Sequence, residues 1–254
     1  MIERVNVLGV GVSAINMQMA LDQIDAWVKR REPQYVSVCN VHSVMECRRD
    51  GRLRQIVNGA GMVTPDGMPL VWLGRLGGQA QVSRVYGPDL MLAELESSLR
   101  SGHSHFFYGG REGVATGLAD RLAKRFPGLR IAGTLTPPFG SAAELCNPAT
   151  AAAINQARPD VVWVGLTSPK QEFWMACMRP LLHAPVLIGV GAAFDFHSGT
   201  VAQAPAWMQR SGLEWLFRLL TEPRRLWRRY LIDNPWFVIE LLGQKLGLRR
   251  YELT

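Results

Sequence analysis

Short apolar runs alternate with amphipathic helical stretches along most of this chain, and this alternation constrains the fold most strongly. Strands and helices that alternate along a chain indicate an α/β domain with a mostly parallel sheet. The runs are apolar throughout, which is typical of parallel strands that are buried on both faces. We predict strands at residues 4–10, 35–41, 104–110, 129–135, 160–166 and 184–191, and a short strand that begins at residue 62.

The helical stretches between these strands carry residues that commonly mark helix ends. Pro88 stands at the start of one stretch and Gly102 directly after its end, as proline and glycine often do. Pro148 interrupts another stretch, so we expect that helix to be broken near this residue. The expected helices cover residues 14–31, 43–60, 88–102, 111–128, 141–159 and 168–182.

The composition changes after about residue 200. Half of the eight tryptophans fall in this last part, arginines become dense, and no strand pattern remains. We therefore expect an α/β domain over residues 1–200 and a helical, basic appendage over residues 201–254. Ligands of parallel α/β domains bind beyond the carboxyl ends of the strands. The loops that follow the expected strands are therefore where we look for a site.

The four cysteines lie far apart, and no pair has C-x-x-C spacing. This spacing indicates neither a zinc site nor a disulfide framework, so a reducing cytoplasm is the simplest compartment. The first residues, MIERVNVLGV, include an acid and no long apolar run, unlike a secretory signal. No uninterrupted apolar segment reaches about 18 residues, the length that a membrane span needs.

One glycine motif resembles a dinucleotide-binding fingerprint. The stretch VNVLGVGVSAIN contains Gly9-x-Gly11-x-x-Ala14 between an expected strand and an expected helix. The acid that normally follows the second strand of such a unit is missing, because the run YVSVCN ends in Asn40. An NAD(P)-binding oxidoreductase that uses residues 9–14 therefore stays an alternative, and a short glycine turn before a helix is the simpler interpretation.

Two loops at strand ends have the composition of phosphate-binding loops. In HFFYGGREGVA, Gly109 and Gly110 would let backbone amides approach a diphosphate at a helix N-terminus, although a tight turn also needs glycine. In GLTSPKQEFW, Lys170 and Gln171 fall in the first helical turn. A lysine there opposes the helix dipole, which favours a positional role over a purely structural one. A solvated surface lysine is the competing interpretation.

The stretch VTPDGMPLVWL holds a single acid, Asp66, in apolar surroundings. Pro-Asp-Gly is a common turn sequence, so Asp66 could serve the turn alone. An ionised carboxylate beside apolar groups costs solvation free energy unless it is paired. The same surroundings would raise its pKa toward the range that suits a general base. Taken alone, the stretch favours the turn, and a catalytic role for Asp66 stays an alternative.

Several stretches taken together resemble the bacterial TagA/WecG/CpsF glycosyltransferases, which include the xanthan enzyme GumM. The resemblance covers nearly the whole chain, and PDGMP, SPKQE and EWLFRLL-x-EPRRLWRRYL are its most specific parts. The stretches that carry it are CNVHSVMECRRD, TPDGMPLVWLGRLGG, RVYGPDLM, FFYGGREGVA, VWVGLTSPKQEFW and the run from GVGAAFDF to LIDNP.

This resemblance implies a Rossmann-like α/β fold and a metal-independent, inverting transfer of a sugar from a UDP-sugar. The implied acceptor is a saccharide on a polyprenyl diphosphate at the inner leaflet, in exopolysaccharide or cell-surface polysaccharide synthesis. GumM-type β-1,4-glucosyl transfer is one such reaction. The resemblance implies no cofactor. The sequence contains no acid pair of D-x-D type that would suggest a metal site, in agreement with the family pattern. Assembly into a homo-oligomer is possible and is left open.

The resemblance also implies roles for single residues. Asp66 matches the acid of the family motif and would be the base, and Arg84 matches an arginine near the pocket that would bind a phosphate. Gln171 would bind sugar hydroxyls. Asn40 matches the last residue of a T-x-N motif in the family, and Val38 replaces the threonine of that motif here. Because one hydroxyl contact is lost, the identity of the transferred sugar is less defined. The weaker candidates are Asp195 for the nucleoside and Phe139 for the uracil face.

The net charge of +7 permits nucleic acid, anionic lipid or phosphorylated substrates as partners. Four arginines lie close together in EPRRLWRRYLIDNPWF, where they fall on one helical arc and apolar residues on the opposite arc. Such a helix is typical of a membrane interface, and the arginines could also bind the carrier diphosphate. The residues assigned to this role are Arg224, Arg225, Trp227, Arg228 and Arg229.

These features predict a cytoplasmic enzyme attached peripherally to the inner face of the plasma membrane. An ordinary surface helix with arginines in water is the competing interpretation of the appendage. Nucleic acid is not expected, because no aromatic stacking platform interleaves a basic groove. A non-catalytic membrane-binding protein stays a further alternative. The donor sugars compatible with the pattern include glucose, N-acetylmannosamine and its uronic acid.

Overall fold

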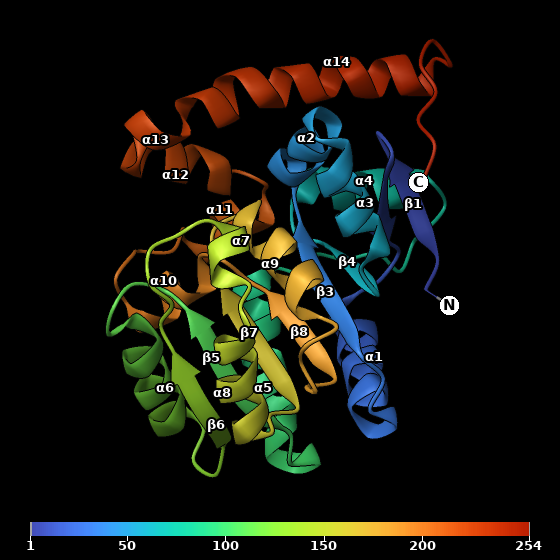
Figure 1. The fold of residues 1–254 in the computed structure, drawn as a ribbon. Helices are drawn as coiled ribbons and strands as arrows, with labels where there is room; N and C mark the ends of the chain where they lie inside the picture. The colour runs from blue at the N-terminus through green and yellow to red at the C-terminus, as the bar shows by residue number, and fades with distance from the viewer. Residues whose placement is uncertain (1, 254) are drawn as a thin grey trace.

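The computed structural model describes residues 2–253 and has a single large sheet at its centre. Six strands, all parallel, follow the order β4-β3-β8-β7-β5-β6, and helices cover both faces of this sheet (Figure 1). The predicted α/β class with a mostly parallel sheet is confirmed. The strands are β3 (Gln34–Cys39), β4 (Met62–Pro65), β5 (Ser104–Gly109), β6 (Arg130–Leu135), β7 (Val161–Gly165) and β8 (Val186–Gly189).

Alternate residues of each central strand pack against different helical layers. In β7, Trp163 joins the core beneath α1, α5, α6 and α10, whereas Val162 and Val164 join the core beneath α7, α8 and α9. Burial on both faces explains why the strand sequences are apolar throughout. These helices are α1 (Met17–Arg30), α5 (Gly87–Ser101), α6 (Val114–Arg125), α7 (Ala142–Leu145), α8 (Pro148–Ala157), α9 (Lys170–Met178) and α10 (Ala193–Ser198).

The first expected strand is not part of the main sheet. Residues 4–13 form an antiparallel hairpin of β1 (Arg4–Val7) and β2 (Val10–Ser13), and Leu8 and Gly9 turn with positive φ angles of 52° and 88°. Gly9 and Gly11 therefore belong to a hairpin and do not join a strand to a helix. The interpretation as a dinucleotide fingerprint is wrong, because that motif needs the turn of a βαβ unit.

One expected helix is two. Residues 41–59 form α2 (Val41–Arg49) and α3 (Gly51–Gly59), separated at Asp50. The Asp50 carboxylate accepts hydrogen bonds from the backbone nitrogens of Arg52 (2.8 Å) and Leu53 (3.1 Å), so it caps the second helix. Farther along, α4 (Met68–Leu76) follows β4, as expected for the brief helix after the Pro-Asp-Gly turn.

Cys146 and Cys177 form a disulfide, contrary to the expectation that the spacing indicates none. The two residues are 31 apart in sequence, but α7 and α9 pack together and bring their Cα atoms to 6.2 Å. The Trp174 indole nitrogen also donates to the Leu145 carbonyl at 3.2 Å across this contact. Sequence spacing does not report such proximity, because it depends on how two helices pack. Cys39 and Cys47 are buried and free.

The last part of the chain is helical, as expected, and docks beside α2. It comprises α11 (Ala206–Arg210), α12 (Glu214–Thr221), α13 (Pro223–Arg228), the π-helical turn η1 (Arg229–Asp233) and α14 (Asn234–Lys245). Figure 1 shows α14 as a long helix along one end of the molecule, above α2. Phe237 of α14 is 3% exposed and joins the hydrophobic core of α2, α3 and the hairpin. Within residues 2–253, no helix combines the length and the apolar character needed to span a membrane.

Candidate active site

Asn40 and Asp66 lie side by side at the carboxyl edge of the sheet. The register of β3 and β4 pairs Cys39 with Pro65, so the residues that follow leave the sheet at the same place. The Asp66 backbone nitrogen donates to the Cys39 carbonyl at 2.9 Å, which fixes the turn. The Asn40 side-chain nitrogen then donates to Asp66 Oδ2 at 3.2 Å. The same asparagine caps α2 through its oxygen, which accepts from Ser43 N.

Arg84 joins this pair from the loop before α5. Its Nε donates to the backbone carbonyl of Asp66 at 2.5 Å, and its Nη2 lies 3.9 Å from Asp66 Oδ1. The guanidinium lies over the ring of Tyr86, with 3.9 Å between its carbon and the ring centroid. The structure thus brings together the candidate base, its asparagine neighbour and the candidate phosphate-binding arginine.

The appendage supplies two more side chains to the same place. Glu214 of α12 accepts from Arg84 Nη2 at 2.5 Å and from the Tyr86 hydroxyl at 2.9 Å. Arg229 of η1 donates from Nη2 to Asn40 Oδ1 at 3.3 Å. The sequence analysis missed Glu214. Its signal was present, since Glu214 is a single acid in the apolar stretch GLEWLFRLL, as Asp66 is in its own stretch.

Asp66 is 8% exposed, and this burial controls its protonation. Burial raises its pKa to about 6; Arg84 and the Asn40 hydrogen bond oppose the rise, whereas the Glu214 carboxylate adds to it. Asp66 Oδ1 is buried and accepts no hydrogen bond from any residue that the structure describes. A carboxylate with a pKa near neutrality and one unused oxygen can take a proton from a bound hydroxyl.

Gln171 lies deep in the carboxyl edge, at the start of α9. It is 4% exposed, and its side-chain nitrogen donates to Glu172 Oε1 at 3.0 Å. A Cβ atom at Gly189 of β8 would lie 3.1 Å from the Gln171 amide carbon, so this side chain packs against the strand. Its oxygen is buried and has no donor among residues 2–253. Gln171 can therefore accept a hydrogen bond from a ligand hydroxyl.

Gly109 and Gly110 end β5, and close packing explains why both are glycine. A Cβ atom at Gly109, where φ is +131°, would lie 2.6 Å from the Gly165 carbonyl. The Gly110 nitrogen donates to that carbonyl at 3.0 Å, which occupies this amide. The tight-turn interpretation accounts for both residues, and their contact with a diphosphate stays a prediction.

Lys170, the first residue of α9, contacts the loop after β6, which carries Phe139. The lysine Nζ donates to the Gly140 carbonyl at 2.6 Å and lies 5.3 Å from the centre of the Phe139 ring. Phe139 is fully exposed at 103%. Phe139 follows β6, the edge strand farthest in the sheet order from β4, and among the described residues no hydrogen bond or ion pair joins Lys170 to Asp66, Asn40 or Arg84. Their roles toward a nucleotide stay predictions.

Asp195 is the third residue of α10, directly after β8. Its backbone carbonyl accepts from the backbone nitrogens of Thr200 (3.0 Å) and Val201 (3.2 Å), and its side chain lies 3.5 Å from the Thr200 hydroxyl. These contacts fit the role of a residue that ends a turn. Its proposed contact with a nucleoside stays a prediction.

The arginines of the appendage divide into two groups. Arg224, Arg225 and Arg228 are exposed, as expected for a helix that faces water or a membrane surface. Arg229 does not share that exposed arc, because the π-helical turn places it against Asn40. Burial lowers its pKa, and Nε of this buried guanidinium has no acceptor among the described residues. Arg229 is therefore available to an anion in the site.

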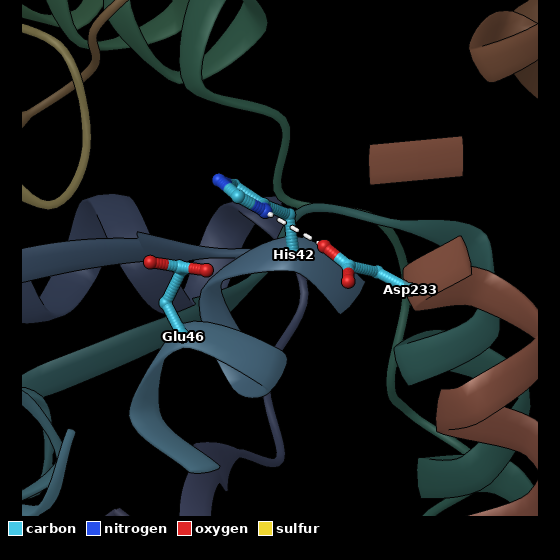
Figure 2. A group of neighbouring side chains, drawn as sticks. All are labelled: His42, Glu46 and Asp233. Carbon is cyan, nitrogen blue, oxygen red and sulfur yellow. Dashed lines mark ion pairs between the residues drawn. The ribbon is translucent and has the colours of Figure 1, made fainter. Parts of the chain in front are cut away.

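A group of side chains that could hold a cation lies nearby, on α2 and η1. Figure 2 shows His42, Glu46 and Asp233, whose ligand atoms lie within 4.8 Å of one another. His42 Nδ1 is 3.6 Å from Asp233 Oδ2. Arg49 already pairs with both carboxylates, at 2.7 Å from Glu46 and in a closer contact with Asp233. The arrangement therefore fits an ion-pair network that docks η1 on α2 better than a metal centre.

Comparisons with known proteins identify the family of this chain. The model of the Glycosyl transferase WecG/TagA/CpsF family matches residues 5–251. A relative from Bacillus spizizenii (strain W23), named N-acetylglucosaminyldiphosphoundecaprenol N-acetyl-beta-D-mannosaminyltransferase, is 32% identical over 216 residues, which cover 85% of this chain and 81% of the relative. A relative of the same name from Bacillus subtilis (strain 168) is 29% identical over 237 residues, or 93% of this chain and 90% of the relative.

The family match covers nearly the whole chain, including the hairpin, the carboxyl edge of the sheet and the appendage. Both relatives carry the name of a glycosyltransferase, which agrees with the general class inferred from the sequence. The chain belongs to the WecG/TagA/CpsF family of glycosyltransferases.

Proposed function

We propose that this protein transfers a sugar from a UDP-sugar to a saccharide carried on a polyprenyl diphosphate, with inversion and without a metal ion. The observation that carries this proposal is the buried Asp66, whose pKa lies at about 6 beside cationic groups from both the domain and the appendage. The relatives' names include a diphosphoundecaprenol acceptor, which supports a lipid-linked acceptor for this chain as well.

The reaction would be one in-line displacement at the anomeric carbon. The acceptor oxygen forms a bond to that carbon while Asp66 takes the hydroxyl proton. The bond between the anomeric carbon and the donor's phosphate oxygen breaks, and UDP leaves with its electron pair. The β configuration in the relatives' names is the product expected when an α-linked nucleotide sugar is inverted.

The negative charge that develops on the leaving diphosphate needs compensation. Arg84 and Arg229 flank the Asp66–Asn40 pair and supply two guanidinium groups from opposite parts of the fold. Guanidinium groups held in place in a partly desolvated site stabilise such charge without reorganisation. Gln171, with its unused buried oxygen, is the proposed acceptor for a sugar hydroxyl.

We further propose peripheral attachment to the inner leaflet through the appendage. Large apolar side chains along η1 and α14 face outward, and the exposed arginines of α13 adjoin them along the chain. An exposed apolar stripe beside basic residues is typical of a helix that lies in a membrane interface. The apolar residues and their exposed fractions are Leu231 57%, Ile232 50%, Trp236 48%, Val238 52%, Ile239 53% and Leu242 55%.

The test uses the Asp66→Asn variant with a synthetic acceptor that carries N-acetylglucosamine on a polyprenyl diphosphate. The relatives' names make UDP-N-acetylmannosamine the first donor, followed by its uronic acid and by UDP-glucose for GumM-type transfer. We expect at least about a hundredfold loss of turnover, which is the usual effect of removing a general base. Asp120→Asn, at an exposed position, is the matched control. Turnover near the wild-type rate in Asp66→Asn would disprove the base role.

A further inference from the structure

A cavity lies outside the Asp66 cluster, where α2, α3 and residues 249–252 meet. Its volume is about 540 Å³, and four of its six lining residues are arginines. None of these residues belongs to the candidate active site. We call this cavity the arginine pocket, and its lining residues are Arg48, Arg54, Arg249, Arg250, Tyr251 and Glu252.

Specific contacts hold the walls of the arginine pocket in place. The Asn6 side chain donates to the Tyr251 carbonyl at 2.6 Å, which ties the end of the chain to the β1–β2 hairpin. The guanidinium of Arg48 lies 5.0 Å from the centre of the Tyr251 ring. A Cβ atom at Gly9 would lie 3.4 Å from Arg54 Cδ, so the hairpin turn packs on the stem of this arginine. The glycine motif of the sequence thus forms part of this wall.

The charges of the pocket are not balanced within it. The buried Glu240, 2% exposed, accepts from Arg48, Arg249 and the Tyr251 hydroxyl, so its two oxygens are fully used. Neither Arg54 nor Arg250 has a carboxylate oxygen within 4.0 Å in the part of the chain that the structure describes. Four guanidinium groups face two carboxylates, those of Glu240 and Glu252, which leaves an excess of two positive charges.

Two donors at this pocket are also unused. The Nε atoms of Arg48 and Arg54 are buried, and they have no hydrogen-bond acceptor among residues 2–253. A buried donor without a partner destabilises the folded state. An anion with several acceptor oxygens would remove this destabilisation and neutralise the excess charge together. A phosphate group has that charge and that set of oxygens, and guanidinium groups bind it in a bidentate manner.

We infer that the arginine pocket binds a phosphate group, and that this phosphate belongs to the headgroup of an anionic phospholipid. Three leucines close in sequence to its arginines are strongly exposed: Leu246 (71%), Leu248 (76%) and Leu253 (48%). Apolar side chains beside a basic pocket suit the boundary between headgroups and acyl chains. The lipid source rests on the proposed membrane attachment, whereas the phosphate chemistry does not.

The experiment measures binding of the full chain to vesicles of phosphatidylcholine with and without phosphatidylglycerol. The test variant is Arg54→Gln with Arg250→Gln, and Arg100→Gln with Arg158→Gln is a control of equal net charge at exposed residues without a recorded ion pair. We expect about a thirtyfold loss of affinity for the anionic vesicles in the test variant, at about fivefold for each basic group. The control is expected to keep the wild-type affinity. Circular dichroism melts confirm that both variants are folded.

A second arm measures protection of the same proteins against heat by inorganic phosphate. Loss of this protection with unchanged vesicle affinity would support the phosphate site and overturn the lipid source. No change in either arm would overturn the whole inference. The variant Arg54→Lys with Arg250→Lys keeps the charge but removes bidentate binding. Wild-type vesicle affinity in this variant would overturn a specific phosphate site and indicate non-specific electrostatic attraction to the anionic vesicles. Neither arm measures sugar transfer, so a failure of the proposed catalytic function would be distinguishable from a failure of the phosphate-binding proposal.

Discussion

Glu214 lies where the appendage meets the candidate base, and its removal should change the pH dependence of catalysis. The carboxylates of Glu214 and Asp66 lie 2.5 and 3.9 Å from the same Nη2 atom of Arg84, so they are no more than about 6.5 Å apart. At this distance two unit charges repel by about 2.5 kcal/mol with an effective dielectric constant of about 20. About 1.4 kcal/mol corresponds to one pKa unit.

The variant Glu214→Gln removes this repulsion and keeps the shape of the side chain. At that separation the repulsion corresponds to about two pH units, and we expect a shift of about one because solvent at the edge of the site screens the two charges. Asp66 must be ionised to accept a proton, so the acid limb of kcat/KM should follow its pKa of about 6 in the wild type. In the variant, the midpoint of this limb should move down to about pH 5.

The assay measures kcat/KM for sugar transfer between pH 4.5 and 8.5. The plateau at high pH is also expected to fall, because glutamine keeps only one of the two oxygens that accept from Arg84 and Tyr86. Glu96→Gln, at an exposed position of α5, is the matched control and should leave the limb unmoved. A limb that stays at its wild-type midpoint in Glu214→Gln, or that moves upward, would refute the electrostatic coupling of these two carboxylates.

The remaining predictions concern stability. The folded pKa of Asp66, about 6, lies above its ordinary value of 3.8, so the folded state binds the proton more tightly and stability falls as pH rises from about 4 to about 6. Asp66→Asn should therefore raise the free energy of unfolding at pH 8 by about 2–3 kcal/mol and leave it nearly unchanged at pH 4, as chemical denaturation at both pH values will show. Phe237→Ala should lower the free energy of unfolding by about 3–5 kcal/mol in urea titrations, whereas Val238→Ala, on the exposed side of the same helix, should cost little. Cys146→Ser should cost about 3–4 kcal/mol in the absence of reductant, because the disulfide closes 31 residues, and an equal cost in dithiothreitol would contradict this account.

The fold class and most elements could be predicted because their signals are local. Buried parallel strands are apolar throughout, and proline and glycine mark helix ends, so β7 and α5 fall where the sequence indicates. The hairpin was misassigned for a physical reason. A strand and a glycine turn precede a helix both in a dinucleotide-binding βαβ unit and in this hairpin. Only the antiparallel pairing of β1 with β2 distinguishes the hairpin from the βαβ unit.

The site was predictable in part. Asn40, Asp66 and Arg84 come together as the motif pattern indicated, because two of them directly follow neighbouring strands. Glu214 stands out as a single acid in an apolar stretch, but its contact with Arg84 depends on how the appendage docks. The inward position of Arg229 depends on a π-helical turn, which leaves no periodic pattern in the sequence. The Cys146–Cys177 pairing was missed for the same reason, since it arises from the packing of two helices.

The contacts of the β1–β2 hairpin have a consequence for how the protein forms during synthesis. Asn6 bonds Tyr251 across 245 positions of the chain, and the Leu8 nitrogen bonds the Gln244 side chain across 236. The hairpin is therefore synthesised more than two hundred residues before Gln244 and Tyr251, and its polar groups find these partners only afterwards. Until α14 is synthesised, the apolar residues of the hairpin can be buried only against α2 and α3.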